Sequence, residues 1–402
     1  MTRHLDLRSG QPVWTMNGMP RIPASPLDGD GVADAVIVGG GVSGALVADA
    51  LLQAGLSVVA IDRREFGRGS SAASTALLAT ELDRPLTQLA DDVGGEKAAR
   101  AYWRCAAAVG FLRARIRDLR LQARFRDRPS VYLPGNVLGL TALRRECEAR
   151  ARIGLRSRFV DGEALLRLIS LQVEGAIVTA GSAEADPLRL VGGLWRSAIA
   201  RGASLHAPVE AREVRESRAG VTVTTADGAR IKARHAVFAT GYELLPFVPA
   251  AASDIHSTWA IATAPQTVWP SRALVWEASD PYFYARTTLD GRVVAGGEDE
   301  PFADDDKRDA LIGQKSKAIA RKLAALWPSL DSTPDYRWTG SFGESRTGLP
   351  TIGRIPGMDR CFAVLGYGGN GFTFSAIAAQ IISRAILGLP DPDEAVFGFD
   401  PK

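Results

Sequence analysis

The chain has 402 residues, of which 46% are hydrophobic and 23% are charged, and its formal net charge is +3. Single hydrophobic cores rarely grow beyond about 250–300 residues, so we expect two domains. The net charge is small and no long basic run or aromatic–basic interleaving occurs, which argues against nucleic-acid binding. The three cysteines suit neither a disulfide framework nor a metal cluster, and they fit a reducing, cytoplasmic location.

Residues 1–30 are rich in proline and contain no apolar stretch, so we expect an extended surface arm, pinned by Trp14, rather than a secretion signal. The most apolar late segment, residues 374–387, carries Gln380 and Arg384 and is too short to cross a bilayer. We therefore expect no integral membrane segment.

The most informative motif is a glycine turn between a buried strand and a helix. The stretch 35–44, Ala-Val-Ile-Val-Gly-Gly-Gly-Val-Ser-Gly, places Gly39, Gly41 and Gly44 at the G-x-G-x-x-G spacing. Such glycines allow a tight turn, a close approach of pyrophosphate and close helix–strand packing, and the helix N-terminus attracts phosphate. Asp62 ends the next strand at the spacing of a carboxylate that binds a ribose hydroxyl. The segment therefore predicts a dinucleotide site.

Periodicity and turn signals predict the remaining elements. Helices are expected at residues 85–121 with a break at Gly94-Gly95, 140–152 as a solvated helix, 186–202 and 307–327. Strands are expected at residues 204–206, 209–214, 221–225, 230–233, 235–242, 258–263, 282–287, 292–295 and 362–365. The last strand runs into Gly366-Tyr-Gly-Gly-Asn-Gly371 and an apolar helix, so a second glycine-rich strand–loop–helix unit stands near the end of the chain.

Together these features resemble the flavin-dependent oxidoreductase family that contains D-amino acid oxidase, glycine oxidase, sarcosine oxidase and the glutamylputrescine-type amine oxidases. The resemblance is nearest to the amine-oxidase branch. The resemblance rests on four motifs, which occur in the same order as in the family. They are residues 38–44 with Asp62, Ala239-Thr-Gly241, Trp338-Thr-Gly340 followed by residues 348–353, and Gly366–Gly371. Together the motifs span nearly the whole chain, from residue 35 to residue 388.

The resemblance implies an α/β fold (α+β overall) with a Rossmann-like FAD-binding domain that is discontinuous in sequence. This domain is expected to comprise residues 31–85, 150–245 and 338–390. A second domain of antiparallel β-strands and helices, which would hold the substrate, is expected from residues 86–149 and 246–337. Residues 1–30 would form the N-terminal arm.

The resemblance also implies FAD bound along the first glycine motif. The residues implied to contact the pyrophosphate are Gly39, Gly41, Val42, Ser43 and Gly44, and those behind the phosphate are Thr240 and Gly241. The ribose and adenine are expected to contact Asp62, Arg63 and the Val209 backbone. The ribityl chain or the flavin ring is expected to contact Ser70, Ser71 and Thr75. A second implied set, beside the flavin's pyrimidine oxygens, is Gly368, Gly369, Asn370, Gly371, Phe372 and Thr373. A helix N-terminus there stabilises the negative charge of reduced flavin.

Departures from the family pattern bear on how flavin and substrate are held. Certain relatives attach flavin covalently through a histidine or a cysteine, and residues 70–75 and 341–345 contain neither, so non-covalent FAD is implied. Amino-acid-oxidising relatives place a carboxylate-clamping arginine just after the Trp-x-Gly element. Here Phe342 stands near that place and the arginine comes only at Arg346, so Glu344 could instead hold a cationic amine.

Four more side chains are candidates for the substrate face of the flavin. Tyr284 and Arg286 alternate with Tyr282 on a predicted strand, which puts all three on one side, although packing within the sheet is equally compatible. His256 precedes the strand at 258–263, and a structural role remains open for it. Tyr367 lies in the C-terminal glycine loop.

The function implied is hydride transfer from a C–N bond of a small amine or amino acid to flavin N5, with reoxidation by oxygen or another acceptor. A hydroxy-acid or polyol-phosphate dehydrogenase is an alternative, which a basic cluster around Arg286 and Arg346 would favour. An alternative from another class is a non-catalytic flavin-binding subunit or a redox sensor. A nicotinamide dehydrogenase would explain the first glycine motif and leave the loop Gly366–Gly371 unexplained.

Overall fold

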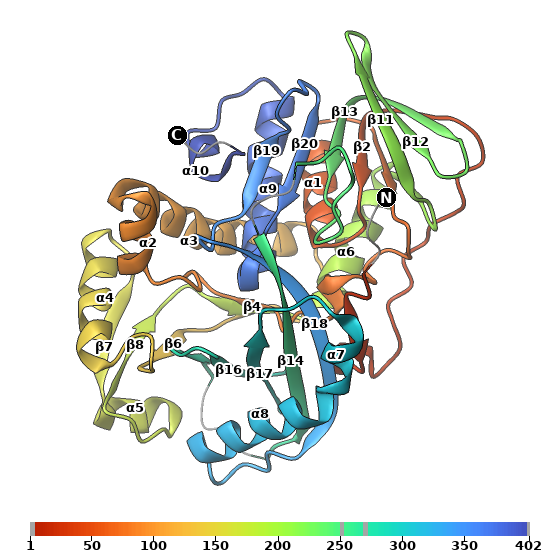
Figure 1. Cartoon of the computed structure of the whole chain (residues 1–402). Coiled ribbons are helices and arrows are strands. Elements are labelled where there is room, and N and C mark those ends of the chain that lie inside the picture. Colours follow the sequence, from red (N-terminus) through yellow and green to blue (C-terminus); the bar gives the residue numbers. More distant parts are fainter. Residues whose placement is uncertain (1–4, 250–252, 268–271, 400–402) are drawn as a thin grey trace.

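The computed structural model describes residues 5–249, 253–267 and 272–399. Two sheets organise this part of the chain, one with the helices α1 and α9 in the upper half of Figure 1 and a larger one in the lower half. A short third sheet is formed by β4 (Leu77–Leu78), β9 (Ala183–Glu184) and β5 (Arg126–Asp127). The mixed α/β fold expected from the sequence is confirmed.

The first sheet has the order β10-β3-β2-β13-β12-β11, with β20 beside β13 and β19 beside β20. Its strands are β2 (Gly31–Val38), β3 (Val58–Ile61), β10 (Ser204–His206), β11 (Ala211–Ser217), β12 (Gly220–Thr225), β13 (Arg230–Phe238), β19 (Thr351–Arg354) and β20 (Cys361–Leu365). The pairs β10–β3, β3–β2, β2–β13 and β13–β20 are parallel, whereas β11–β12, β12–β13 and β19–β20 are antiparallel. The helices α1 (Val42–Gln53), α6 (Pro187–Ala200) and α9 (Gly371–Ile386) pack together on one face.

The central strand β2 is buried on both faces, which explains its continuous apolar sequence. Ala35 and Ile37 pack with the helices, whereas Val36 and Val38 contact the core on the opposite face. Gly39 follows at a φ of +119°, and a Cβ there would lie 2.2 Å from the Ala239 carbonyl oxygen. The chain can therefore turn directly from the end of β2 into α1 only with glycine at this position.

The second sheet has nine strands in the order β1-β18-β14-β17-β16-β15-β6-β8-β7. They are β1 (Arg8–Gly10), β6 (Ser130–Leu133), β7 (Ser157–Asp161), β8 (Gly175–Thr179), β14 (Ser253–Pro265), β15 (Leu274–Glu277), β16 (Phe283–Thr287), β17 (Arg292–Glu300) and β18 (Pro334–Ser345). One face packs against α8 (Ile312–Leu326), where Ile319 and Leu323 share a core with Trp259 and Ile261. The opposite face turns toward the first sheet.

The remaining helices complete the two layers. They are η1 (Val13–Thr15), η2 (Ser70–Ala72), α2 (Leu86–Val93), α3 (Gly95–Asp118), α4 (Leu140–Arg152), α5 (Gly162–Ile169), α7 (Asp305–Ala310), η3 (Gly368–Asn370) and α10 (Glu394–Phe397). None of the helices in the described ranges is long and apolar enough to cross a membrane.

Sheet membership differs from the expected domain boundaries in two places. The strands β7 and β8 lie within residues 150–245, which were expected in the FAD-binding domain, and they extend the nine-stranded sheet instead. The helix α3 lies within residues 86–149 and packs on α9, in the core of the first sheet. A short strand or an amphipathic helix shows which of its faces is apolar but not which surface that face will meet.

The expectation of a solvated helix at 140–152 is wrong. The helix α4 has the expected bounds, but it buries Leu143, Glu146, Cys147 and Arg150. The Arg150 Nε atom lies 2.7 Å from the Glu146 carboxylate, so the two charges enter the interior as a pair. The Arg/Glu-rich sequence of this helix therefore includes a buried ion pair, which the sequence alone did not indicate.

The N-terminal arm is tied to both sheets. The strand β1 pairs antiparallel with β18, and Arg8 lies opposite Gly340. The indole Nε1 of Trp14 donates to the Ser74 carbonyl at 2.9 Å, in the loop that follows η2. The Leu5 amide donates to Glu243 at 2.8 Å, beyond the end of β13.

The substitution Gly44→Ala tests the close packing of α1 on the turn. A Cβ at residue 44 would lie 2.0 Å from the Gly39 carbonyl oxygen, so we expect the free energy of unfolding to fall by about 1–3 kcal/mol. Thermal unfolding measures this. The control is Gly313→Ala in α8, where a Cβ meets nothing within 4 Å and helix propensity should raise stability slightly. Equal stability of the Gly44 variant and the wild type would contradict the proposed close contact.

Candidate active site

A large cavity lies between the two sheets, with an empty volume of about 1910 Å³ counted with its open mouth. Its wall combines the turn after β2, the end of β3, η2, the loop 366–371 and the inward face of β14, β16 and β18. We call the part around Asp62, Arg63 and Val209 the nucleotide end. We call the part around Asp83, Tyr284 and Phe342 the substrate end.

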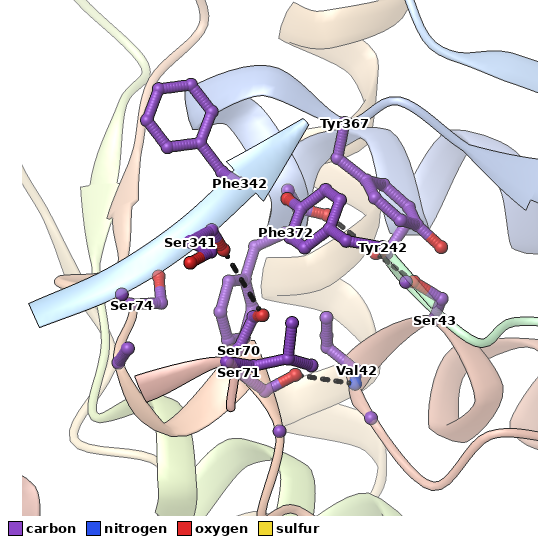
Figure 2. Close-up of a pocket in the computed structure, with 18 of the residues that line it drawn as sticks. Val42, Ser43, Ser70, Ser71, Ser74, Tyr242, Ser341, Phe342, Tyr367 and Phe372 are labelled. Atoms are coloured by element: carbon purple, nitrogen blue, oxygen red, sulfur yellow. Dashed lines mark hydrogen bonds between the residues drawn. The ribbon is translucent and has the colours of Figure 1, made fainter. Parts of the chain in front are cut away.

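The glycine turn forms the wall beside the N-terminus of α1. Gly39, Gly41, Val42 and Ser43 line the cavity, and Gly41 is the helix N-cap without a side chain to cap it. The hydroxyl of Ser71 accepts from the Val42 amide at 3.1 Å (Figure 2). Backbone N–H groups and the positive end of the helix dipole at a helix N-terminus are the groups that bind a pyrophosphate.

Asp62 stabilises the same turn from the end of β3. Its carboxylate accepts from the Gly40 amide at 2.6 Å and from the Arg64 amide at 2.7 Å. Burial raises the pKa of Asp62 in spite of these two hydrogen bonds. The amide of Val209 donates to the Asp62 carbonyl at 2.7 Å, which places both residues at the nucleotide end as expected.

Glu243 is a residue that sequence reasoning missed. Its carboxylate accepts from Arg63, from Arg64 at 2.7 Å and from the Leu5 amide at 2.8 Å. Burial alone would raise the pKa of Glu243, but the hydrogen bonds from Arg64, Leu5 and Arg63 outweigh it and lower that pKa. Glu243 therefore joins the N-terminal arm to the nucleotide end. No local signal in the sequence indicates this contact, since its partners lie far away in the chain.

The middle of the cavity is formed where η2 meets β18. The Ser70 hydroxyl donates to the Ser341 carbonyl at 3.3 Å, and Figure 2 shows this contact below Phe342. A Cβ on Gly340 would lie 3.0 Å from the Ala73 side chain, so the two segments are in close contact. Thr75 lines the cavity as well.

The second glycine loop meets the first at the start of α9. The hydroxyls of Ser43 and Ser375 lie 2.7 Å apart and connect α1 to α9. Gly368, Gly369, Asn370, Gly371 and Phe372 line the cavity, as do Thr240 and Gly241 after β13. Two of the expected cofactor residues are not on the wall: Gly44 packs against the turn, and Thr373 is buried behind it.

The six substrate candidates separate into two groups. Tyr284 and Tyr367 line the cavity. Arg286 is buried behind its wall, where its guanidinium donates to the carbonyls of Thr75 at 2.6 Å and Ala185 at 2.8 Å. The Arg286 guanidinium therefore links the backbone segment that contains Thr75 to the segment that contains Ala185.

The other three candidates also lie off the wall. Arg346 is exposed in the turn after β18. The ring of His256 stacks on Phe342 with 5.5 Å between centroids, and burial lowers its pKa. Glu344 is half-buried further along β18, where burial raises its pKa. Tyr282, which alternates with Tyr284 in the sequence, also lines the cavity, and the missed side chains at the substrate end include Asp83, Tyr242 and Trp276.

The residues on the wall suit a bound FAD. The cavity extends from Asp62 and Val209 at the nucleotide end to Tyr284 at the substrate end, and both glycine loops line it. Its lining, within the described ranges, contains no cysteine or histidine that could bond to the flavin. The nucleotide end presents a helix N-terminus and two arginines, which suit a pyrophosphate.

The comparisons with known proteins define the class. Residues 34–385 match the family model DAO, described as FAD dependent oxidoreductase, and the chain belongs to this family. It is similar to the probable oxidoreductase OrdL of Rhizobium meliloti (strain 1021), with 26% identity over 93% of this chain and 88% of that protein. It is also similar to the gamma-glutamylputrescine oxidoreductase of Escherichia coli (strain K12), with 23% identity over 91% of this chain and 86% of that protein.

Solved structures show the same fold. Glycine oxidase from Geobacillus kaustophilus superposes with a TM-score of 0.77 at 18% identity, over 92% of this chain and 98% of the other. L-Proline dehydrogenase from P. horikoshii gives 0.76 at 18% identity, over 91% and 97%. The resemblance inferred from the sequence is confirmed: the protein is an FAD-dependent oxidoreductase, an enzyme whose cofactor is FAD.

The substitution Asp62→Ala tests the nucleotide end. It removes the acceptor of two turn amides and the carboxylate that we assign to the ribose, so we expect the FAD dissociation constant to rise at least about tenfold. Flavin fluorescence after dilution measures the release. The control is Asp34→Ala, whose carboxylate binds the Ser57 amide at 2.9 Å and does not line the cavity. Full flavin occupancy in the Asp62 variant would refute the ribose role.

Proposed function

We propose that the enzyme oxidises small amines that carry no carboxylate on the reacting carbon. Bound FAD would supply the acceptor for a hydride from the carbon of the C–N bond, and oxygen or another acceptor would take up the electrons. The protein's contribution is to bind the amine, orient its C–H bond and exclude water. Because the chain itself supplies no redox group, substrate choice depends on the wall of the substrate end.

The charge of that wall is the observation that supports the proposal. Among the described residues that line the cavity, the only arginines or lysines are Arg63 and Arg64, and both are bonded to Glu243 at the nucleotide end. The substrate end contributes the carboxylate of Asp83 and a set of aromatic rings, whereas Glu81, which also lines the cavity, is buried and paired with Arg150 at 3.6 Å. A carboxylate substrate would need a cation for bidentate binding, whereas an ammonium group is attracted to carboxylates and ring faces.

The alternatives receive less support from the positions of the arginines. A hydroxy acid or polyol phosphate needs a cluster of basic side chains in the cavity. Arg286 is buried behind the wall and donates to two backbone carbonyls, and Arg346 is exposed, so neither supplies such a cluster. Amino acids need the same kind of cation. The relative named for gamma-glutamylputrescine is consistent with an amine substrate, whereas the solved structures named for glycine and L-proline concern amino acids.

Anaerobic titration of the purified flavoprotein tests the proposal. Primary and secondary alkylamines should bleach the oxidised flavin bands, while α-amino acids with the same side chains should do so far more slowly. Dithionite reduction is the positive control for a reducible flavin. If amino acids or hydroxy acids bleach the flavin and amines do not, the proposed substrate class is wrong.

The substitution Arg346→Ala provides a second test. Because Arg346 is exposed and off the cavity wall, we expect kcat and KM for amines to change less than about twofold. Steady-state kinetics with one amine and one amino acid measures this. A large rise in KM confined to the amino acid would indicate a carboxylate clamp and contradict the proposal.

A further inference from the structure

Asp83 is the charged side chain that is best placed to meet an amine. It lies in the segment between β4 and α2 and lines the substrate end of the cavity. Its Oδ2 atom accepts from the Gly369 amide at 2.9 Å. A Cβ on Gly369 would lie 2.6 Å from the same oxygen, so the glycine loop before α9 fits closely around the carboxylate. The carboxylate is therefore held in place by this hydrogen bond and by a second one from the Asn370 side chain.

Aromatic rings line the same cavity as Asp83. Tyr282 and Tyr284 lie with 5.6 Å between centroids, and Tyr242 meets Tyr367 edge-on at 6.0 Å. Figure 2 shows Tyr242 and Tyr367 next to each other, close to Phe372. Trp276 and Phe342 extend the aromatic wall. Ring faces attract an ammonium group, and the apolar rings keep water from an ion pair formed beside them.

Two acidic side chains interact electrostatically with Asp83, namely Glu344 on β18 and Asp299 on β17. The other titratable groups that interact with it are Cys105 on α3, Tyr132 on β6, Tyr242 after β13, and Tyr282 and Tyr284 at β16. The adjacent Arg84 is bonded to Asp92 at 2.7 Å.

The acidic surroundings affect the protonation of Asp83. Burial, followed by repulsion from Glu344, raises the pKa of Asp83 to about 6, although the Gly369 amide and the Asn370 side chain lower it. Asp83 is nonetheless exposed to solvent, and it lines the open cavity. The carboxylate can then be ionised near neutral pH and can still accept a proton.

We propose that Asp83 is the residue that binds the substrate ammonium group and takes its proton. This inference rests on the proposed amine oxidation. An N–H bond of R–NH₃⁺ breaks, an O–H bond forms on Asp83, and the electron pair of the broken bond stays on nitrogen. The resulting neutral amine has the lone pair that assists loss of hydride from the adjacent carbon. Asp83 therefore sets both the charge preference of the site and its dependence on pH.

Binding of a cation that cannot be oxidised tests this role without turnover. The probe is tert-butylammonium, which has no hydrogen on the carbon next to nitrogen, and its isosteric anion pivalate is the matched control. Perturbation of the flavin absorption spectrum measures both dissociation constants. We expect the wild type to bind the cation in preference to the anion. Its affinity for the cation should fall as the pH drops through about 6, because protonation removes the charge of Asp83.

The variant Asp83→Asn keeps an acceptor for the Gly369 amide and removes the charge. We expect it to bind tert-butylammonium at least about tenfold more weakly, to bind pivalate no more weakly, and to lose the pH dependence near 6. Anaerobic flavin reduction by an oxidisable amine should slow as well. The control is Asp34→Asn, which removes a carboxylate that binds the Ser57 amide off the cavity wall and should leave cation binding unchanged.

The outcomes separate this inference from the proposed function. If Asp83→Asn keeps the affinity and pH profile of the wild type while amines still bleach the flavin, the role of Asp83 is wrong and the proposed function stands. If no amine bleaches the wild-type flavin, the proposed function fails, and the proton-transfer role fails with it. The FAD spectrum and unfolding temperature of the variant establish whether the site is intact.

Discussion

The pairing of β20 with β13 is the constraint on which the rest of the active site depends. It inserts a strand from the end of the chain beside a strand near its middle, parallel and in register from Ala236 opposite Cys361 to Phe238 opposite Ala363. Parallel neighbours end at the same edge of a sheet, so the loops after β2, β13 and β20 meet there. The two helices that begin at this edge, α1 and α9, then point their N-termini into one cavity, joined by the hydroxyls of Ser43 and Ser375.

The two ends of the cavity differ in the groups that they present. At the nucleotide end, the N-terminus of α1 suits a pyrophosphate, and Glu243 ties Arg63 and Arg64 to the N-terminal arm. At the substrate end, the Asp83 carboxylate and aromatic rings line the wall, which is why we propose a cationic substrate. The nine-stranded sheet supplies the aromatic part of this wall and keeps its other face packed on α8.

Local chemistry made the secondary structure and the cofactor predictable. The helix at 140–152, the strand at 204–206 and the break at Gly94-Gly95 follow from periodicity and from turn residues, and the structure has them as expected. The residues of the two glycine loops line the cavity because their function needs backbone rather than side chains. The substrate-binding residues were harder to predict. Arg286 and Arg346 were candidates from their positions in the sequence, but neither lines the cavity. Arg286 is buried against backbone carbonyls, and Arg346 is exposed in a turn.

The sequence by itself determined that this protein is a dinucleotide-binding oxidoreductase of the DAO family. Glycine spacing and a strand-terminal carboxylate are local requirements of phosphate and ribose binding, and they are visible in order along the chain. Tertiary structure alone decided which charged side chains line the cavity. Asp83 reaches its wall beside the Gly369 amide, 286 residues away, which donates to its carboxylate. Such a contact depends on how two distant segments pack, so no local pattern could reveal it.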